Sequence, residues 1–217
     1  MSTPTLGIFL PLTAKPDQAA ALGQFLLAGY DILAPGVEPD TLQWFAVKYA
    51  SGAEPVYAIF DTFAAEPGRQ AHFAGPVAAA LQANADALLA KAPDFAHAPC
   101  DVLASLVRAA PAPGAVAKGL QSGLRVLVRA KPEKVDAVRE FLKGALPLVE
   151  AEPLTAAWYA IEFPGTGAFG IVDFFPSQEG LDAHLKGEVA KALFANADAL
   201  LTQAPDVMTL EVVAALV

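Results

Sequence analysis

Two kinds of ionisable side chain recur together in this sequence and could carry out proton transfer. Asp61 and His72 are followed, 112 positions later, by Asp173 and His184. A histidine can accept or donate a proton near neutral pH, and a neighbouring carboxylate can orient its ring. We therefore treat these four residues as candidate catalytic residues. The alternative is structural: an aspartate at the end of a strand, and a histidine that bonds a free carbonyl in the last turn of a helix.

An asparagine is the third polar residue that both copies keep. Asn84 and Asn196 lie on the next segment, which has the apolar periodicity of a helix. At about 100° per residue, Asn84 falls on the same stripe as Leu81 and Leu88. A buried amide must be hydrogen-bonded, so it either bonds a core carbonyl or faces a ligand cavity. We count both asparagines as candidate substrate contacts.

Two tryptophans and one arginine complete the candidate substrate-binding set. Trp44 and Trp158 begin matching segments rich in aromatic and β-branched residues, and each is either a core residue or part of a cavity wall. Arg69 stands three residues before His72, whereas the second copy has Leu181 at that place. This difference predicts two sites that are not identical, the first of which prefers a substrate with an anionic group.

The motifs of many common enzyme classes are absent from the sequence. The three histidines are too dispersed for a recognisable metal-ligand spacing. No phosphate-binding loop, dinucleotide-binding glycine pattern or serine nucleophile motif occurs. We therefore expect no metal and no other cofactor. The remaining chemistry is proton transfer in an apolar cavity, or a ligand that supplies its own reactivity.

Composition limits the partners of this chain. The 217 residues are 55% hydrophobic and 17% charged, with a net charge of −9. This balance argues against nucleic acid, which needs a basic surface. No apolar run approaches the ~20 residues of a membrane span, and no secretory signal pattern is evident. The single cysteine, Cys100, is expected to be buried and fits the reducing cytoplasm, where we expect the protein to act.

The elements that position these residues also occur twice. Each unit reads as a strand, a helix, a hairpin of two strands, two helices and a last strand, which is a ferredoxin-like arrangement of the α+β class. The predicted boundaries are a first unit over 1–108, a linker over 109–123 and a second unit over 124–217. Alternation places Tyr57, Ile59, Asp61 and Phe63 on one face of a strand. Both faces of each sheet are expected to be buried, with the two sheets packed together like a fused homodimer. The sequence leaves a further association of two chains open.

Several segments resemble the small bacterial antibiotic biosynthesis monooxygenase-like proteins. The resemblance rests on Trp44-Phe45-Ala46, on 58–63, 68–76 and 101–104, and above all on the pattern Asp…Gly-Arg-x-Ala-His-x-x-Gly that contains Asp61 and His72. It covers one family unit, and the second half resembles that unit again. The second copy departs from the pattern at Leu181 and Glu188, where the first has Arg69 and Pro76.

The resemblance implies a dimeric α+β barrel, here formed within one chain as a pseudo-dimer. It also implies oxidation of a hydroxylated aromatic compound, such as a quinol or polyphenol, by molecular oxygen without metal or flavin. His72 or His184 would be the base, with Asp61 or Asp173 as its orienter. Haem-degrading relatives share the fold, but their iron-binding histidine has no evident equivalent here. The alternative is a non-catalytic protein that binds a small molecule or serves as a scaffold.

Overall fold

The two halves of the chain repeat the same order of elements. The computed structural model describes residues 2–34, 36–112 and 114–217. The first half contains β1 (Leu6–Thr13), α1 (Ala19–Leu33), β2 (Thr41–Tyr49), β3 (Val56–Phe63), α2 (Glu66–Phe73), α3 (Pro76–Leu88) and β4 (Pro99–Val107). The second half contains β5 (Ser122–Arg129), η1 (Pro132–Lys134), α4 (Val135–Gly144), α5 (Leu146–Glu150), β6 (Ala157–Phe163), β7 (Ala168–Phe175), α6 (Gln178–Leu185), α7 (Glu188–Leu200) and β8 (Asp206–Leu216).

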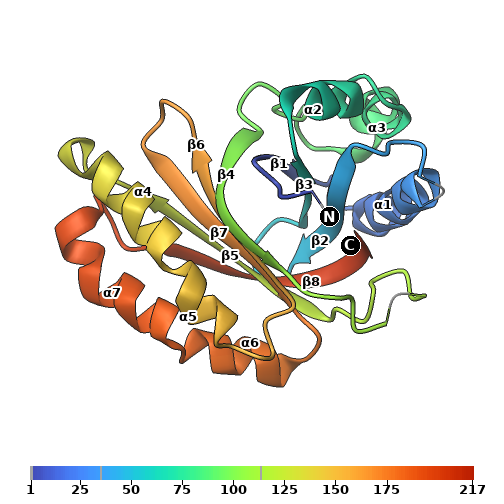
Figure 1. The fold of residues 1–217 in the computed structure, drawn as a ribbon. Helices are drawn as coiled ribbons and strands as arrows, with labels where there is room; N and C mark the ends of the chain where they lie inside the picture. Colours follow the sequence, from blue (N-terminus) through green and yellow to red (C-terminus); the bar gives the residue numbers. More distant parts are fainter. Residues whose placement is uncertain (1, 35, 113) are drawn as a thin grey trace.

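The strands of both halves close into a single barrel. Their order around the barrel is β1-β3-β2-β8-β5-β7-β6-β4. The helices of the first half lie on one side of the barrel and those of the second half on the opposite side (Figure 1). The predicted fold, an α+β barrel built from two ferredoxin-like units in one chain, is confirmed.

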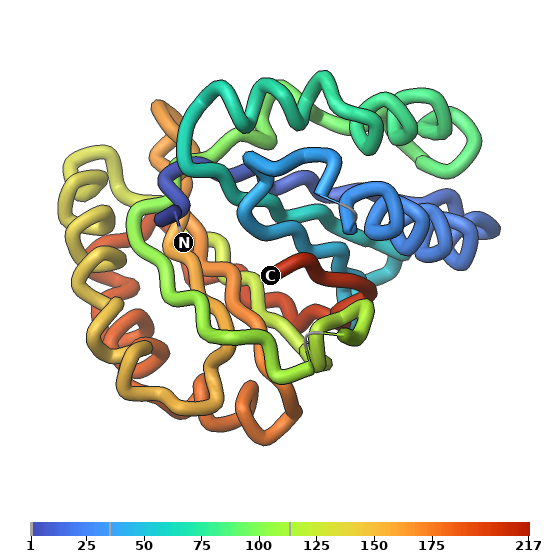
Figure 2. The backbone as a smooth tube through the Cα atoms, turned by 45° about the vertical axis from the view of Figure 1, so that its right-hand side comes forward, coloured from blue at the N-terminus to red at the C-terminus, as the bar shows by residue number. Residues whose placement is uncertain are grey.

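The last strand of each half extends into the sheet of the other half. β4 starts beside β1, with Gly7 opposite Cys100, and continues beside β6, with Leu106 opposite Trp158. β8 likewise leaves β5 to pair with β2, and the tube in Figure 2 can be followed through both crossings. The two sheets are therefore joined by hydrogen-bonded strands, and do not simply pack face to face. Closure leaves no strand edge unpaired, which removes a site of aggregation.

Strand alternation divides the side chains between the barrel interior and the layers beneath the helices. The interior contains aromatic residues from both halves, such as Phe45 and Phe174, whose rings stack with centroids 3.8 Å apart. Ile59 and Trp44 point away from the barrel interior, on the strand faces that are covered by α1 and α3. Since Asp61 shares the face of Ile59, the candidate residues lie between barrel and helices, outside the barrel interior.

Several element boundaries differ from the sequence-based prediction. β5 begins at Ser122, two residues before the predicted start of the second unit. The first helix, α1, begins at Ala19. Its counterpart in the second half is divided into η1, α4 and α5, and Pro147 stands in the first turn of α5.

Cys100 is buried, as predicted. Within the part of the chain that the structure describes, no helix is long and apolar enough to cross a membrane.

Candidate active site between the barrel and the helices

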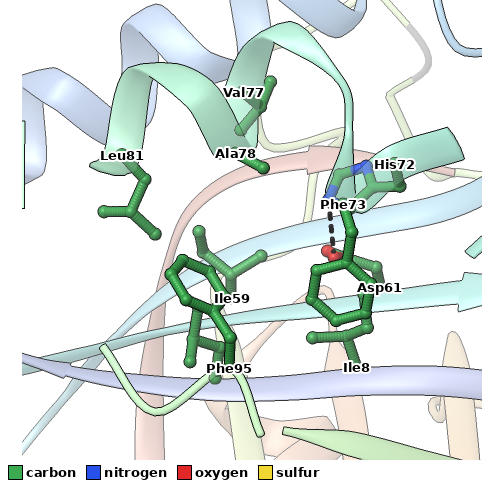
Figure 3. Close-up of a pocket in the computed structure, with 10 residues that line it drawn as sticks. Ile8, Ile59, Asp61, His72, Phe73, Val77, Ala78, Leu81 and Phe95 are labelled. Atoms are coloured by element: carbon green, nitrogen blue, oxygen red, sulfur yellow. Dashed lines mark ion pairs between the residues drawn. The ribbon is translucent and has the colours of Figure 1, made fainter. Parts of the chain in front are cut away.

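His72 on α2 bridges two carboxylates. Its Nε2 lies 3.0 Å from Oδ2 of Asp61 on β3 (Figure 3), and its Nδ1 lies 2.5 Å from Oε2 of Glu38, which precedes β2. The Thr41 hydroxyl donates a second hydrogen bond to the same Glu38 oxygen, at 3.2 Å. Both ring nitrogens of a buried imidazole are therefore paired with acidic groups.

The second half repeats this arrangement. His184 on α6 lies 3.0 Å from Oδ2 of Asp173 through Nε2, and 2.6 Å from Oε2 of Glu152 through Nδ1. Thr155 donates to Glu152 at 2.9 Å, as Thr41 does to Glu38. The predicted pairing of aspartate with histidine is thus present twice, with a glutamate as an additional partner.

This arrangement does not suit a metal ion. The two carboxylates contact opposite nitrogens of one ring, so the three groups cannot converge on one point. Among the residues that the structure describes, no group of three or more His, Cys, Asp or Glu side chains is placed to hold a metal ion. The acidic groups instead stabilise the protonated, positively charged form of the imidazole.

The two carboxylates determine the protonation state of the histidine. Burial opposes the charged imidazolium, but the charges of Asp61 and Glu38 and their hydrogen bonds outweigh it and raise the pKa of His72 to about 10. Asp173 and Glu152 raise the pKa of His184 to about 10 in the same way. An imidazole that is already protonated at neutral pH cannot accept a proton. The role of base therefore does not fit the charge state of either histidine.

The aspartates are better placed to accept a proton. Burial raises the pKa of Asp61, and the positive charge of His72 acts in the opposite direction. Oδ1 of Asp61 is buried and has no hydrogen-bond partner among the described residues, and the same holds for Oδ1 of Asp173. A buried acceptor without a partner is costly. It is therefore a point where a ligand hydroxyl could bind.

A small apolar cavity lies beside each histidine. The first has a volume of about 20 Å³ and is lined by Asp61, His72 and apolar side chains of β1, β3, α2 and α3 (Figure 3). The second has a volume of about 30 Å³ and is lined by His184 and the equivalent apolar positions of the second half. Each volume suits roughly one water molecule. An aromatic compound could enter only if the helices or side chains moved apart.

The predicted placement of the asparagines is wrong. Asn84 and Asn196 are exposed, and each amide donates to the carbonyl four residues earlier, at 2.9 Å to Ala80 and 2.8 Å to Ala192. The inward stripe of α3 passes from Leu81 to Ala85, so the position of Asn84 is rotated to the outer face by about 100°. The amide is satisfied within its own helix and does not face the cavity.

The tryptophans are core residues beside the site. Trp44 and Trp158 are fully buried. They stand opposite Asp61 and Asp173 in the register of neighbouring strands. Neither lines the cavity of its half. Their indole nitrogens have no hydrogen-bond partner among the described residues.

Arg69 is directed away from the cavity. Its guanidinium contacts the carbonyl of Cys100 at 3.3 Å and that of Gly7 at 3.5 Å, and it pairs with Glu66 at 2.5 Å. It therefore connects α2 to β1 and β4. The predicted preference of the first site for an anionic substrate has no basis in this geometry.

Glu38 and Glu152 are the site residues that the sequence prediction missed. The signal for them was present, because Glu38-Pro39 and Thr41 recur as Glu152-Pro153 and Thr155 at a constant offset of 114. Residues that lie between regular elements have no periodicity that would indicate where their side chains point. Their recurrence therefore did not identify them as site residues.

Solved structures share this architecture over nearly the whole chain. A candidate monooxygenase from Fusobacterium nucleatum has a TM-score of 0.82 at 13% identity, with 99% of this chain and 95% of that chain covered. An anthrone oxidase-like protein has a TM-score of 0.60 at 12% identity, with coverage of 99% and 93%. A Listeria monocytogenes ferredoxin-fold protein related to antibiotic biosynthesis monooxygenases has a TM-score of 0.53 at 12% identity, with coverage of 97% and 95%.

Comparisons of sequence alone give no further relationship. No protein-family model matches the chain, and no curated protein does so. At identities of 12% and 13%, the structural likeness establishes the fold and leaves the substrate undetermined. The chain has the fold of the antibiotic biosynthesis monooxygenase-like proteins, with both ferredoxin-like units in a single polypeptide.

Proposed function

We propose that this protein is a monooxygenase-type enzyme that oxidises a hydroxylated aromatic compound with molecular oxygen and without a cofactor. The observation that carries the proposal is the unpartnered carboxylate oxygen Oδ1 of Asp61, which lies beside the apolar cavity of the first half. The names of the structural neighbours, which include a candidate monooxygenase and an anthrone oxidase-like protein, agree with it.

The carboxylate begins the reaction by accepting the proton of the aromatic hydroxyl. Since burial raises the pKa of Asp61, it is a stronger base than an exposed aspartate. The resulting phenolate or enolate passes one electron to molecular oxygen, and the two radicals then combine to form a carbon–oxygen bond. The peroxide formed takes the proton back from the carboxylate, and loss of water from a carbon that carries both the hydroperoxide and a hydrogen gives a carbonyl, so one oxygen atom enters the product and the other leaves as water. This balance requires no external reductant.

His72 and Glu38 support this step without contacting the substrate carbon atoms. The imidazolium holds Oδ2 of Asp61 at 3.0 Å, which leaves Oδ1 free, and Glu38 fixes the other side of the ring. The apolar lining keeps water from competing for the carboxylate and protects the radical pair. His72 and Glu38 are thus positioning residues, and Asp61 is the proposed proton acceptor.

A second candidate function is binding without turnover, or a purely structural role. The volumes of about 20 and 30 Å³ favour it, because neither cavity can hold an aromatic ring as it stands. The complete pairing of both nitrogens of His72 is also what a structural histidine would show. The two functions differ in whether oxygen is consumed.

Oxygen uptake with a panel of quinols and anthrones separates these functions. We expect the wild-type protein to consume oxygen with at least one compound, and an Asp61→Asn, Asp173→Asn double variant to be about 100-fold slower or more, since a positioned base contributes 10²-fold or more. An Asn84→Ala, Asn196→Ala variant is the control, and its rate should match that of the wild type. Wild-type uptake no faster than that of the aspartate variant, or of a His72→Ala, His184→Ala variant, would reject the enzyme. Thermal stabilisation by these compounds without uptake would favour binding alone.

A further inference from the structure

A segment that is neither helix nor strand covers the first cavity. Residues 91–97 run between α3 and β4, and their Phe95 lines the cavity together with Phe73 of α2. The two rings are half-buried and pack edge to face, with centroids 6.2 Å apart. Figure 3 shows both rings beside Asp61. The residues on either side of Phe95 are exposed, so its ring separates the cavity from solvent.

The backbone of this segment is hydrogen-bonded to β1 only beyond its two ends. Before the segment, the amide of Ala90 donates to the carbonyl of Thr13 at 2.9 Å. After it, the carbonyl of Ala98 accepts from the amide of Phe9 at 2.8 Å. Between these two points β1 has Pro11, which has no N–H to donate. No backbone–backbone hydrogen bond joins the segment itself to the rest of the described chain. The segment can therefore move without breaking the sheet.

The segment passes the edge of β1 between two spaces on opposite faces of that strand. The first cavity lies on the face of Ile8 and Leu10. The opposite face carries Phe9 and Pro11, which line a surface groove of about 410 Å³. The other residues that line this groove are Thr13, Ala98 and four members of the segment, namely Lys91, Ala92, Asp94 and His97. The groove leaves room for the segment to move aside and carry Phe95 out of the cavity.

The equivalent residues of the second half form a strand. Asp206, the counterpart of Asp94, begins β8. Val207, the counterpart of Phe95, stands opposite Val126 where β8 pairs with β5. The second half thus holds this position by strand pairing, whereas the first half holds it by the contact between two aromatic rings.

We infer that residues 91–97 are the gate of the first cavity, and that the ring of a hydroxylated aromatic ligand takes the place of Phe95. The space that a departing phenyl ring leaves has the size of a benzene ring, so the closed cavity can be as small as about 20 Å³. The bound ring packs against Phe73, where aromatic contact is favourable. Its hydroxyl reaches Asp61, which lines the cavity and whose Oδ1 has no partner among the described residues. The chemical class of the ligand rests on the proposed function, and the gate rests on the geometry of the segment.

Calorimetric titration with 4-methylphenol tests the gate. A closed gate weakens the apparent affinity in proportion to the fraction of molecules that are open, so Phe95→Ala should bind this probe at least tenfold more tightly than the wild type. Phe95→Leu removes less packing and should bind at least threefold more tightly. Val207→Ala, at the matched position of the second half, should leave the affinity within twofold. Unchanged or weaker binding in both Phe95 variants would show that the ring is a fixed part of the core and reject the gate.

Toluene, a ring of the same shape without the hydroxyl, tests the contact with Asp61. Phe95→Ala should bind 4-methylphenol at least tenfold more tightly than toluene, because a hydrogen bond to a carboxylate is a strong one. This preference should fall below threefold when Asp61→Asn is added. A preference that persists in the double variant, or no preference at all, would show that the hydroxyl does not contact Asp61.

Nuclear magnetic resonance locates the probe and the movement without reference to turnover. We expect 4-methylphenol to shift the imidazole resonances of His72 and the backbone amide resonances of residues 91–97. The amides of residues 203–209, which are equivalent in the second half, should stay in place. Shifts at 203–209 without shifts at 91–97 would overturn the inference. So would the absence of binding to both the wild type and Phe95→Ala at millimolar concentration.

This inference and the proposed function can fail separately. Binding of 4-methylphenol with movement of residues 91–97, but without oxygen uptake from any compound of the panel, would remove the oxidation and keep the gate. Oxygen uptake with the same KM in the wild type and in Phe95→Ala would keep the oxidation and remove the gate.

Discussion

At the scale of single residues, the site is a buried cation held between two acidic groups. Such an arrangement is expensive to desolvate and is stable only when every charge has a close partner. His72 satisfies this condition through Asp61 on one side and Glu38 on the other, and Thr41 adds a hydrogen bond to Glu38. Removal of either acid would leave the ring with a single partner. Both carboxylates therefore contribute to keeping the imidazole charged.

This charge state predicts that stability falls in alkaline solution. The folded pKa of His72 is about 10, whereas the unfolded value is 6.5. Below about pH 6.5 both states bind the proton and the stabilisation is complete. From pH 6.5 to 10 only the folded state holds it, so the free energy of unfolding decreases by up to about 1.4 kcal/mol per pH unit for each histidine. Urea unfolding at pH 7 and 9.5 measures this decrease.

Single histidine variants provide the controls for this pH dependence. His72→Gln should remove about half of the decrease, because His184 is equivalent and keeps its own proton. His97→Gln should leave the decrease intact, since the His97 side chain is 79% exposed. Stability that is constant or rises between pH 7 and 9.5 would show that the imidazoles are not held as cations.

The sequence predicted part of this site. The remaining residues could not be placed from the sequence for physical reasons. Recurrence together with strand alternation was sufficient to associate Asp61 with His72. Glu38 could not be placed, because it lies in a connection where no periodicity fixes the path of the chain. Asn84 was misplaced because neighbouring residues on a helix differ in direction by about 100°. Ala85 faces inward, so the amide of Asn84 faces outward. A polar residue on an apparent apolar stripe is thus weak evidence for a site.

At the scale of elements, the junction between α2 and α3 determines how closely Glu38 can approach His72. Gly75 caps the N-terminus of α3, and a Cβ atom there would collide with Oε1 of Glu38. Gly187 caps α7, and its Cβ would lie 2.5 Å from Oε1 of Glu152. Each glycine stands where one helix ends and the next begins. Because glycine has no side chain, each also leaves room for the carboxylate that pairs with the histidine.

Alanine substitutions at these glycines test this explanation. Gly75→Ala should displace Glu38, lower the free energy of unfolding by about 1–3 kcal/mol, and lower the pKa of His72. Gly144→Ala is the matched control, because no atom lies within 4 Å of its Cβ at the end of α4. It should be neutral or stabilise by up to about 1 kcal/mol. Equal effects of the two substitutions in urea unfolding would exclude a specific collision at Gly75.

At the scale of the whole molecule, the two halves form one body because each completes the sheet of the other. The barrel interior contains side chains from both halves in a single cluster. The apolar pattern predicted the strands and their buried faces, but it could not show which strand pairs with which. The crossing of β4 and β8 was therefore not predicted, and only the family resemblance implied a barrel. The division of the first helix of the second half into α4 and α5 was also not predicted.

Such a shared barrel should unfold in one cooperative transition. Leu26 of α1 and Leu142 of α4 are fully buried residues of the first and second half, respectively. Leu26→Ala and Leu142→Ala should each lower the free energy of unfolding of the whole chain by about 2–5 kcal/mol. The fluorescence of Trp44 and of Trp158, followed separately in Trp158→Phe and Trp44→Phe variants, should change at the same urea concentration in each leucine variant. Two separated transitions would mean that the halves are independent.

The protonation state of the two buried histidines decides which residue accepts the proton, because the aspartates can serve as proton acceptors only if the imidazoles are already charged. Nuclear magnetic resonance titration of the imidazole groups from pH 5 to 11 gives the pKa of each histidine, with His72→Gln and His184→Gln variants to assign the signals. We expect His72 and His184 to stay protonated through pH 8 and to titrate near pH 10. Titration of either residue near the ordinary value of 6.5 would instead show a neutral imidazole at neutral pH and return the role of base to histidine.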